Sequence, residues 1–186
     1  MTVDMELLER IGRELLTALG EDPTRPGLVD TPSRFARWWQ EFIDYEPGDT
    51  ERTFDVENAD EMVVVTGIKV WSLCEHHLLP FNATVAVGYI PTGKVLGLSK
   101  FGRIAHHAAH RLQIQERLVQ DIADAVAKAT GSSDVAVIAD GEHLCMTMRG
   151  VKAPATLRTS VLRGLFKDDP AARAEFMSIV LGHNGR

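Results

Sequence analysis

The two cysteines of the chain, Cys74 and Cys145, constrain its fold more than any other feature, because each has histidine close by and they lie far apart. Cys74 comes three residues before His77, and Cys145 comes two residues after His143. A single Cys-x-x-His pair is a weak signal, since a buried cysteine beside solvated histidines explains it equally well. If both segments bind one metal ion, however, the fold must bring them together.

Alternating side chains in residues 143–149 predict a strand that carries the second cysteine. The apolar side chains at positions 144, 146 and 148 would face the core. The opposite face would then present His143, Cys145, Thr147 and Arg149. One face of this strand would thus offer an imidazole, a thiolate and a guanidinium in a row.

Cys74, His77 and Cys145 form a Cys2His set whose soft thiolates favour zinc. Three protein ligands leave the fourth position of a tetrahedral zinc ion for water, as in a catalytic site. A fourth ligand from His76 or His143 would instead give a closed structural site, and the spacing alone leaves that alternative open.

Size and charge limit the class of protein. The 186 residues suit one domain, residues 1–186, with a real hydrophobic core. The formal net charge of -6 argues against nucleic acid as a partner and would repel an anionic substrate. An anionic substrate would therefore need a local group of basic residues.

No apolar run approaches the roughly 20 residues of a membrane-spanning helix, so we expect no membrane partner. Residues 1–10 mix acidic with apolar side chains and do not resemble a signal peptide. Free cysteines fit a reducing compartment. We expect a cytoplasmic protein.

Hydrophobic periodicity predicts an α+β fold with a mostly antiparallel sheet and helices packed against it. A helical region comes first, with a helix over residues 5–19 and a second that begins at Thr31 as N-cap and Pro32 as first helical residue. Residues 45–60 are expected to be a surface connection. Further helices are expected over 99–112, 115–130 and 170–181, and strands over 62–72, 82–90, 95–98, 134–139, 143–149 and 156–162.

Candidate anion-binding residues begin the helix at 99–112. Ser99 would cap it, leaving free backbone N–H groups at its start, and Lys100 and Arg103 would share one face. Arg149 would join them from the strand that carries Cys145. The sequence contains no GxxxxGK[ST] loop, so a bound nucleotide would be a reactant rather than an energy source.

Three histidines on the same predicted helix, His106, His107 and His110, lack an HExxH signature. We interpret them, like His183, as a solvated or interface surface.

Several segments of the chain together resemble the GTP cyclohydrolase I family. They are Cys-Glu-His-His-Leu-Leu-Pro-Phe at 74–81, Gly-Leu-Ser-Lys at 97–100, Gln-Glu-Arg-Leu at 115–118, His-x-Cys-x-x-x-Arg-Gly at 143–150, and the Gly-Glu-Asp-Pro stretch with the arginines that follow it at 20–34. The resemblance covers nearly the whole chain, in order.

The resemblance implies conversion of GTP to 7,8-dihydroneopterin triphosphate with release of formate, by a homodecamer of the tunnelling fold with active sites between subunits. It implies an antiparallel sheet with helices on one face, in which residues 61–186 form the catalytic part and residues 1–45 the helical part. It also implies zinc ligands at Cys74, His77 and Cys145.

Roles for individual residues follow from the same resemblance. His143 is expected to be the acid that protonates the purine, while His76 could shuttle protons, contact substrate or orient His77. Glu116 alone would read as an acid stabilised at a helix start, but the resemblance makes it the guanine acceptor. Gln115 is placed in the substrate site, and Arg34 is expected to reach the triphosphate from a neighbouring subunit.

Two alternatives belong to other classes of protein. A zinc-stabilised oligomer that binds a purine or pterin without turnover would have a closed four-ligand site. A reductase of the same fold would need a nucleophilic cysteine, whereas both cysteines here are assigned to metal.

Overall fold

The computed structural model describes residues 3–57 and 61–183. The chain divides into two compact units, and the boundary falls between Glu46 and Pro47. The first unit is a pair of helices, α1 (Met5–Ala18) and α2 (Thr31–Ile43). Asp4 caps α1 by accepting a hydrogen bond from the backbone of Leu7 at 2.9 Å. The helices pack where Gly12 lies against Pro32 and Phe35, since a Cβ at Gly12 would come within 3.2 Å of both.

The start of α2 differs by one residue from the prediction. Thr31 is the first helical residue rather than the N-cap, because the carbonyl of Asp30 already accepts the first helical hydrogen bond, from Arg34 at 3.0 Å. Pro32 thus lies one residue further into the helix, where its missing N–H is still tolerated.

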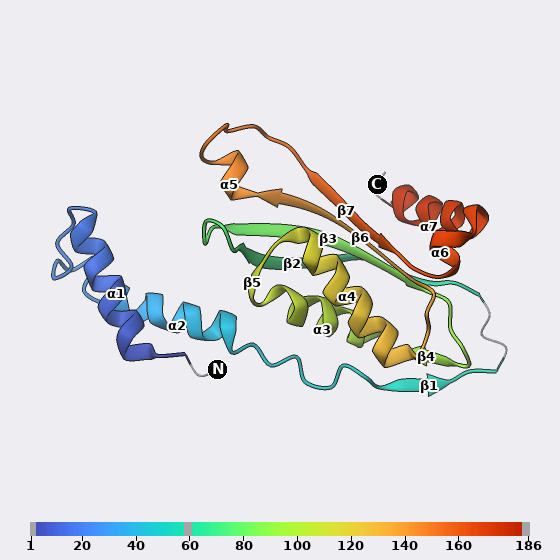
Figure 1. Cartoon of the computed structure of the whole chain (residues 1–186). Coiled ribbons are helices and arrows are strands. Elements are labelled where there is room, and N and C mark those ends of the chain that lie inside the picture. Colours follow the sequence, from blue (N-terminus) through green and yellow to red (C-terminus); the bar gives the residue numbers. More distant parts are fainter. Residues whose placement is uncertain (1–2, 58–60, 184–186) are drawn as a thin grey trace. The chain divides into compact units, whose positions relative to one another are not determined.

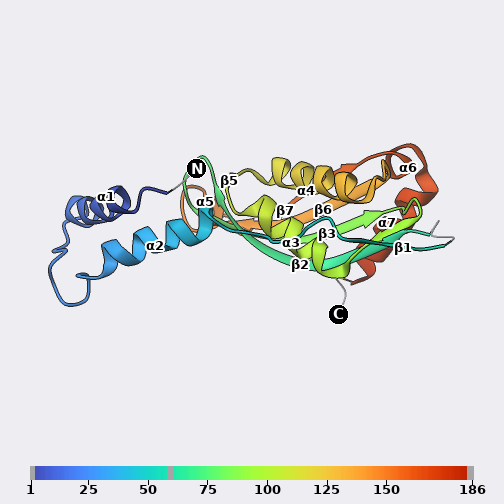
Figure 2. The same cartoon turned by 90° about the horizontal axis from the view of Figure 1, so that it is seen from below.

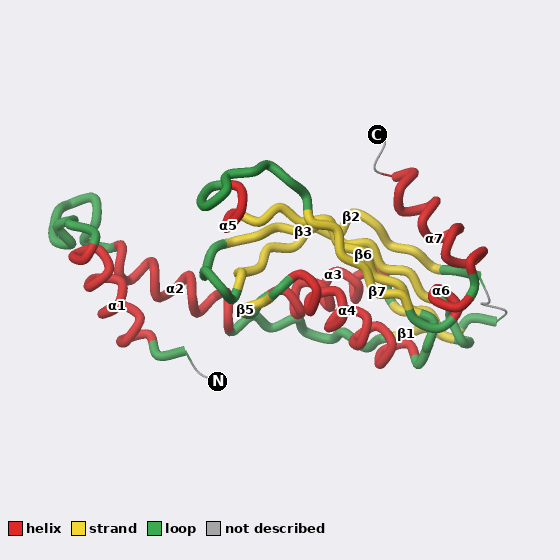
Figure 3. Tube along the Cα trace, turned by 45° about the horizontal axis from the view of Figure 1, so that its top comes forward, coloured by secondary structure: helices red, strands yellow, loops and turns green. Residues whose placement is uncertain are grey.

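A five-stranded sheet forms the centre of the second unit, with the strand order β5-β2-β3-β6-β7. The four longer strands are antiparallel neighbours, and only β5 runs parallel to its partner β2. Figure 3 shows these strands side by side. Their bounds are Val63–Cys74 for β2, Pro80–Tyr89 for β3, Leu112–Gln113 for β5, Val135–His143 for β6 and Leu157–Leu162 for β7.

Helices cover both faces of this sheet, as Figures 1 and 2 show. The helices α3 (Leu98–Ala109) and α4 (Gln115–Thr130) pack on one face, over odd-numbered residues of β3 and β6 such as Val85 and Val137. The even-numbered residues, such as Ala86 and Ile138, pack with α6 (Leu165–Asp168) and α7 (Pro170–His183). The period-two alternation of buried strands thus supplies two cores, whereas helices were expected on one face only.

Residues 45–60 contain a strand that the sequence did not predict. The strand β1 (Thr53–Asp55) pairs with β4 (Lys94–Leu96) in a separate two-stranded sheet. The acidic composition of this stretch suggested a loop, but the pairing depends on a partner some 40 residues away and is invisible to local pattern. Residues 58–60 lie outside the described chain.

The predicted strand over residues 143–149 is wrong beyond its first residue. The strand β6 ends at His143 and is followed by a one-turn helix, α5 (Leu144–Thr147). The neighbouring strands explain this ending, since β3 pairs with β6 only as far as Phe81 opposite His143, and β7 only as far as Leu157 opposite Gly141. Without a partner the chain coils, and the amide of Met148 donates to the carbonyl of Leu144 at 3.1 Å.

Candidate metal centre

A tight turn at the end of β2 brings His77 back toward Cys74. The carbonyl of Cys74 accepts from the amides of His77 and Leu78 at 3.2 and 2.8 Å, and Leu78 has a φ of +54°. The turn sets Nδ1 of His77 3.8 Å from Sγ of Cys74. Cys74 lies at the buried C-terminal end of β2 and is only 5% exposed, whereas His77 is exposed.

Cys145 reaches the same point from α5. Its thiol, the thiol of Cys74 and a ring nitrogen of His77 all lie within 4.8 Å of one another. Donors around a tetrahedral zinc ion, bound at about 2.0–2.3 Å, are separated by about 3.5–3.8 Å. The three donors therefore fit one metal ion, and two thiols with an imidazole suit a soft ion such as zinc.

Burial raises the pKa of the Cys145 thiol, and the neighbouring Cys74 raises that pKa further. Both cysteines are free thiols. Since thiolates are the species that bind metal, ion binding at this centre must displace protons from the cysteines.

Neither of the other two candidate ligands joins this group in the described part of the chain. Nδ1 of His76 lies 3.8 Å from Sγ of Cys74, and the ring of His76 is exposed. The ring of His143 is bound elsewhere, with Nε2 at 2.9 Å from Oε1 of Gln115. Among the described residues, the donor atoms that lie within 4.8 Å of one another are thus those of Cys74, His77 and Cys145.

His143 is held beside this group as the last residue of β6. Its ring stacks on Phe81, with centroids 4.4 Å apart and planes within 4° of parallel. Burial lowers the pKa of His143, and the negative charge of Glu116 raises it in part. A cavity of about 310 Å³ opens between His143 and Cys145 on one side and Leu157 on the other.

Two candidate residues in the first turn of α4 have different surroundings. Glu116 is exposed, and its charge acts on His143. Gln115 is 0% exposed and its side chain is occupied by hydrogen bonds within the chain. The sequence placed both in the substrate site, and only Glu116 is accessible.

The basic residues expected to bind an anion are differently arranged. Gly97, not Ser99, is the N-cap of α3, so the predicted cap is wrong; the chain enters the helix from the β4 side, where Gly97 N donates to Arg52 O at 3.1 Å. Lys100 and Arg103 do share a face. Both bind the segment that precedes β1, Lys100 through the carboxylate of Asp49 at 2.9 Å and Arg103 through the carbonyl of Pro47 at 3.2 Å.

The two remaining arginines are exposed. Arg149 follows α5, and its charge lowers the pKa of Cys145 against the stronger effect of burial. Arg34 belongs to the first unit, where it binds Asp30 at 3.1 Å.

The histidines of α3 form a separate cluster. Nδ1 of His110 lies 2.6 Å from the carbonyl of His106, and burial lowers the pKa of His106, with a further lowering from His110. His107 and His110 line a cavity of about 320 Å³ together with Arg111 and Asp121. The side chain of His183 lies outside the described atoms.

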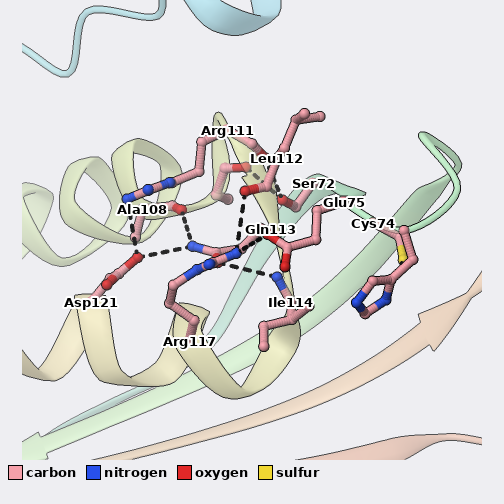
Figure 4. Close-up of polar contacts among 12 residues, drawn as sticks. Ser72, Cys74, Glu75, Ala108, Arg111, Leu112, Gln113, Ile114, Arg117 and Asp121 are labelled. Atoms are coloured by element: carbon pink, nitrogen blue, oxygen red, sulfur yellow. Dashed lines mark hydrogen bonds and ion pairs between the residues drawn. The ribbon is translucent and has the colours of Figure 1, made fainter.

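Sequence reasoning missed a network that ties the turn between Cys74 and His77 to α4 (Figure 4). Arg117 forms an ion pair with Glu75, which lies within this turn, and donates through Nε to Gln113 at 2.6 Å. Gln113 is 0% exposed and also donates to Asp121 at 2.9 Å. No periodic pattern marks such residues, although Glu75 and Arg117 both stand inside the motifs that carry the family resemblance.

An α+β fold with a three-donor Cys2His group that could hold a metal ion, and an imidazole held beside it, is typical of a class of metal-dependent enzymes. The sequence model of GTP cyclohydrolase I matches residues 8–181. The chain belongs to the GTP cyclohydrolase I family, as the motifs predicted.

Curated relatives match along nearly the full chain. The GTP cyclohydrolase 1 of Hyperthermus butylicus is 46% identical over 98% of this chain and 94% of its own length. That of Corynebacterium glutamicum strain R is 48% identical, over 92% and 90%. Among solved structures, an archaeosine synthase QueF-like protein in the apo form shows a TM-score of 0.43 and 20% identity over 53% of this chain and 91% of that chain, which is too distant to assign a fold.

No helix within residues 3–57 and 61–183 is both long enough and apolar enough to cross a membrane.

Proposed function

We propose that this protein hydrolyses GTP to 7,8-dihydroneopterin triphosphate and formate at a zinc site formed by Cys74, His77 and Cys145. The observation that carries the proposal is the convergence of these three donors within 4.8 Å, next to a half-buried imidazole. The membership of the chain in the GTP cyclohydrolase I family supports the substrate. When bound, zinc would lower the pKa of a water molecule to about 7 and so supply hydroxide near neutral pH.

The residues of the chain then have separate tasks. C8 of guanine is a poor electrophile, and protonation of N7 by His143 makes C8 more open to attack. Glu116 accepts hydrogen bonds from N1–H and the 2-amino group of guanine, a donor pair that adenine lacks. Glu116 is exposed and its charge acts on His143, which supports a guanine ring bound between these two side chains.

Charge on the triphosphate is met by Lys100, Arg103 and Arg149, and by Arg34 of a neighbouring subunit. The ammonium of Lys100 now binds Asp49, whose pKa it lowers, so the triphosphate must compete with that carboxylate. Ser99, exposed at the start of α3, is a candidate to bind a ribose hydroxyl. His76 remains a candidate for proton transfer during ring opening.

We further propose a cytoplasmic homodecamer of the tunnelling fold, in which residues 61–186 form the catalytic part and residues 1–45 a helical part. Exposed apolar side chains support burial against other subunits. On α1 they include Leu15, which is 47% exposed, and in the second unit Trp71, Leu98 and Val151, which are 58%, 75% and 77% exposed.

The test is metal analysis of the purified protein combined with product identification from GTP. Zinc-loaded protein should release formate and form a fluorescent pterin. Cys145→Ser should lose both metal and activity, whereas His143→Ala should keep zinc and lose ring opening. Zinc-loaded wild type without either product would refute the function, and loss of zinc from His143→Ala would make His143 a ligand.

A further inference from the structure

Gln115 is a fully buried polar side chain whose orientation follows from its neighbours. Its side-chain nitrogen lies 2.9 Å from the carbonyl of Ala139 and 2.9 Å from the carbonyl of Leu157. Backbone carbonyls only accept hydrogen bonds, so the atom that faces them must be the amide NH2. Oε1 of Gln115 is therefore the atom that faces Nε2 of His143, at 2.9 Å.

This orientation determines where the neutral imidazole of His143 carries its hydrogen. Because Oε1 of Gln115 has no hydrogen to donate, Nε2 of His143 must be the donor, and the lone pair of the neutral ring lies on Nδ1. Stacking on Phe81 holds the plane of the ring. The hydrogen bond and the stack together fix the tautomer and the orientation of His143.

We propose that Gln115 is a positioning residue rather than a substrate ligand: it holds His143 with Nε2–H bound and leaves Nδ1 as the ring nitrogen that meets the substrate. This inference rests on the proposed function. The hydrogen bond to Gln115 and the stacking on Phe81 hold the ring in one orientation, so that Nδ1 is the ring nitrogen left free to face N7 of the purine.

Gly141 provides the space that this arrangement needs. A Cβ at Gly141 would lie 2.1 Å from Oε1 of Gln115 and 2.9 Å from the carbonyl of Asn82. Gly141→Ala should therefore push the amide of Gln115 off His143 while leaving Gln115, His143 and the three proposed ligands in the sequence. Gly102→Ala is a matched control, because a Cβ at Gly102 meets nothing within 4 Å.

The experiment compares zinc-loaded wild type with Gln115→Met, Gln115→Glu, Gly141→Ala and Gly102→Ala. Gln115→Met, which has no hydrogen-bonding oxygen, should lower kcat by about 10- to 100-fold, the usual cost of removing a partner that orients a functional histidine. KM for GTP and zinc content should stay within about threefold of wild type. Gly141→Ala should lower kcat in the same way, and Gly102→Ala should leave it unchanged.

The conservative variant Gln115→Glu tests the chemistry of the contact. In its protonated form the Glu side chain can donate to one buried carbonyl and accept from His143. The kcat of Gln115→Glu should therefore be at least about fivefold higher than that of Gln115→Met. A role in packing alone would not give this rescue.

A second measurement does not depend on turnover. In the proton NMR spectrum, a slowly exchanging ring N–H signal, assigned by its absence in His143→Ala, should be present in wild type and Gly102→Ala and absent in Gln115→Met and Gly141→Ala. A signal that persists in both, or a rise in KM at unchanged kcat in Gln115→Met, would overturn the proposal. If wild type shows the signal but does not convert GTP, the proposed function fails while the positioning of His143 stands.

Discussion

The ion pair between Glu75 and Arg117 should control how tightly the metal-binding turn holds its ion. Glu75 lies between Cys74 and His77, and Arg117 reaches it from the first turn of α4. Replacing Arg117 by Met keeps most of the aliphatic stem and removes the guanidinium. We expect the turn to loosen and zinc affinity to fall before the fold is lost.

The magnitude follows from exposure. The two side chains are 33% and 37% exposed, so the ion pair is screened and contributes at most about 1 kcal/mol. The bond from Arg117 Nε to Gln113 adds about 1–2 kcal/mol. Gln113 Oε1 keeps the amide of Ile114 at 3.1 Å and is not left unpaired. A total near 2 kcal/mol, if all of it appears in metal binding, weakens zinc affinity by roughly 30-fold.

Competition with a chromophoric chelator measures this affinity for wild type, Arg117→Met, Glu75→Gln and the double variant. Arg163→Met is the matched control, because Arg163, like Arg117, binds one acid and one glutamine. These partners are Asp124 at 2.6 Å and Gln120 at 3.0 Å, both on α4. It lies beyond β7, beside the start of β6 rather than its end, and should leave zinc affinity within twofold of wild type. Unchanged zinc affinity in Arg117→Met together with a lower denaturation midpoint would show that the pair stabilises the fold and not the turn.

Three further changes have defined outcomes. Glu116→Ala should raise KM for GTP by roughly 10- to 100-fold, the loss of hydrogen bonds to a charged acceptor, without altering zinc content; steady-state kinetics with metal analysis checks this, and an unchanged KM would remove Glu116 from guanine recognition. Gly102→Ala should raise Tm by about 2–4 °C, because alanine is favoured by up to about 1 kcal/mol inside α3; a lower Tm in a thermal melt would mean that the side chain meets a neighbour. Burial and the charge of His110 lower the pKa of His106 in the folded state. As pH falls below about 6.5, His106 is therefore protonated in the unfolded chain before it is protonated in the folded protein. The free energy of unfolding should then decrease with falling pH, by at most about 1.4 kcal/mol per pH unit. Denaturant unfolding at pH 7.5 and 5.5 should show a smaller decline in His106→Gln, and an equal decline in both proteins would contradict the assignment.

Local pattern was sufficient for elements whose signals lie within their own residues. The helix α4 has the predicted bounds, since its apolar period is regular and Gly131 ends it with a φ of +72°. The segment after His143 shows the opposite case. Its alternating Leu144 and Met146 look like a strand, but a strand needs a paired neighbour, and the pairing of β3 with β6 ends at Phe81 opposite His143.

Some features of the candidate site could be predicted from the sequence, and others could not. The convergence of Cys74, His77 and Cys145 could be predicted, because the residue types alone show which side chains can bind a soft metal ion. The partner of Lys100 is Asp49, and the burial of Gln115 depends on carbonyls of β6 and the β7 edge. Contacts of this kind join segments that are distant in the sequence, so local sequence patterns could not predict them.

Three consecutive residues at the start of α4 have three different surroundings: Gln115 contacts the imidazole of His143, Glu116 is exposed, and Arg117 binds Glu75 in the turn between Cys74 and His77. Each residue of a helix is rotated by about 100° from the one before it. A single insertion or deletion in the short link ahead of this turn would therefore misdirect all three side chains at once. Natural or engineered length variation is consequently least tolerable at this junction, even though it is remote in sequence from every metal ligand.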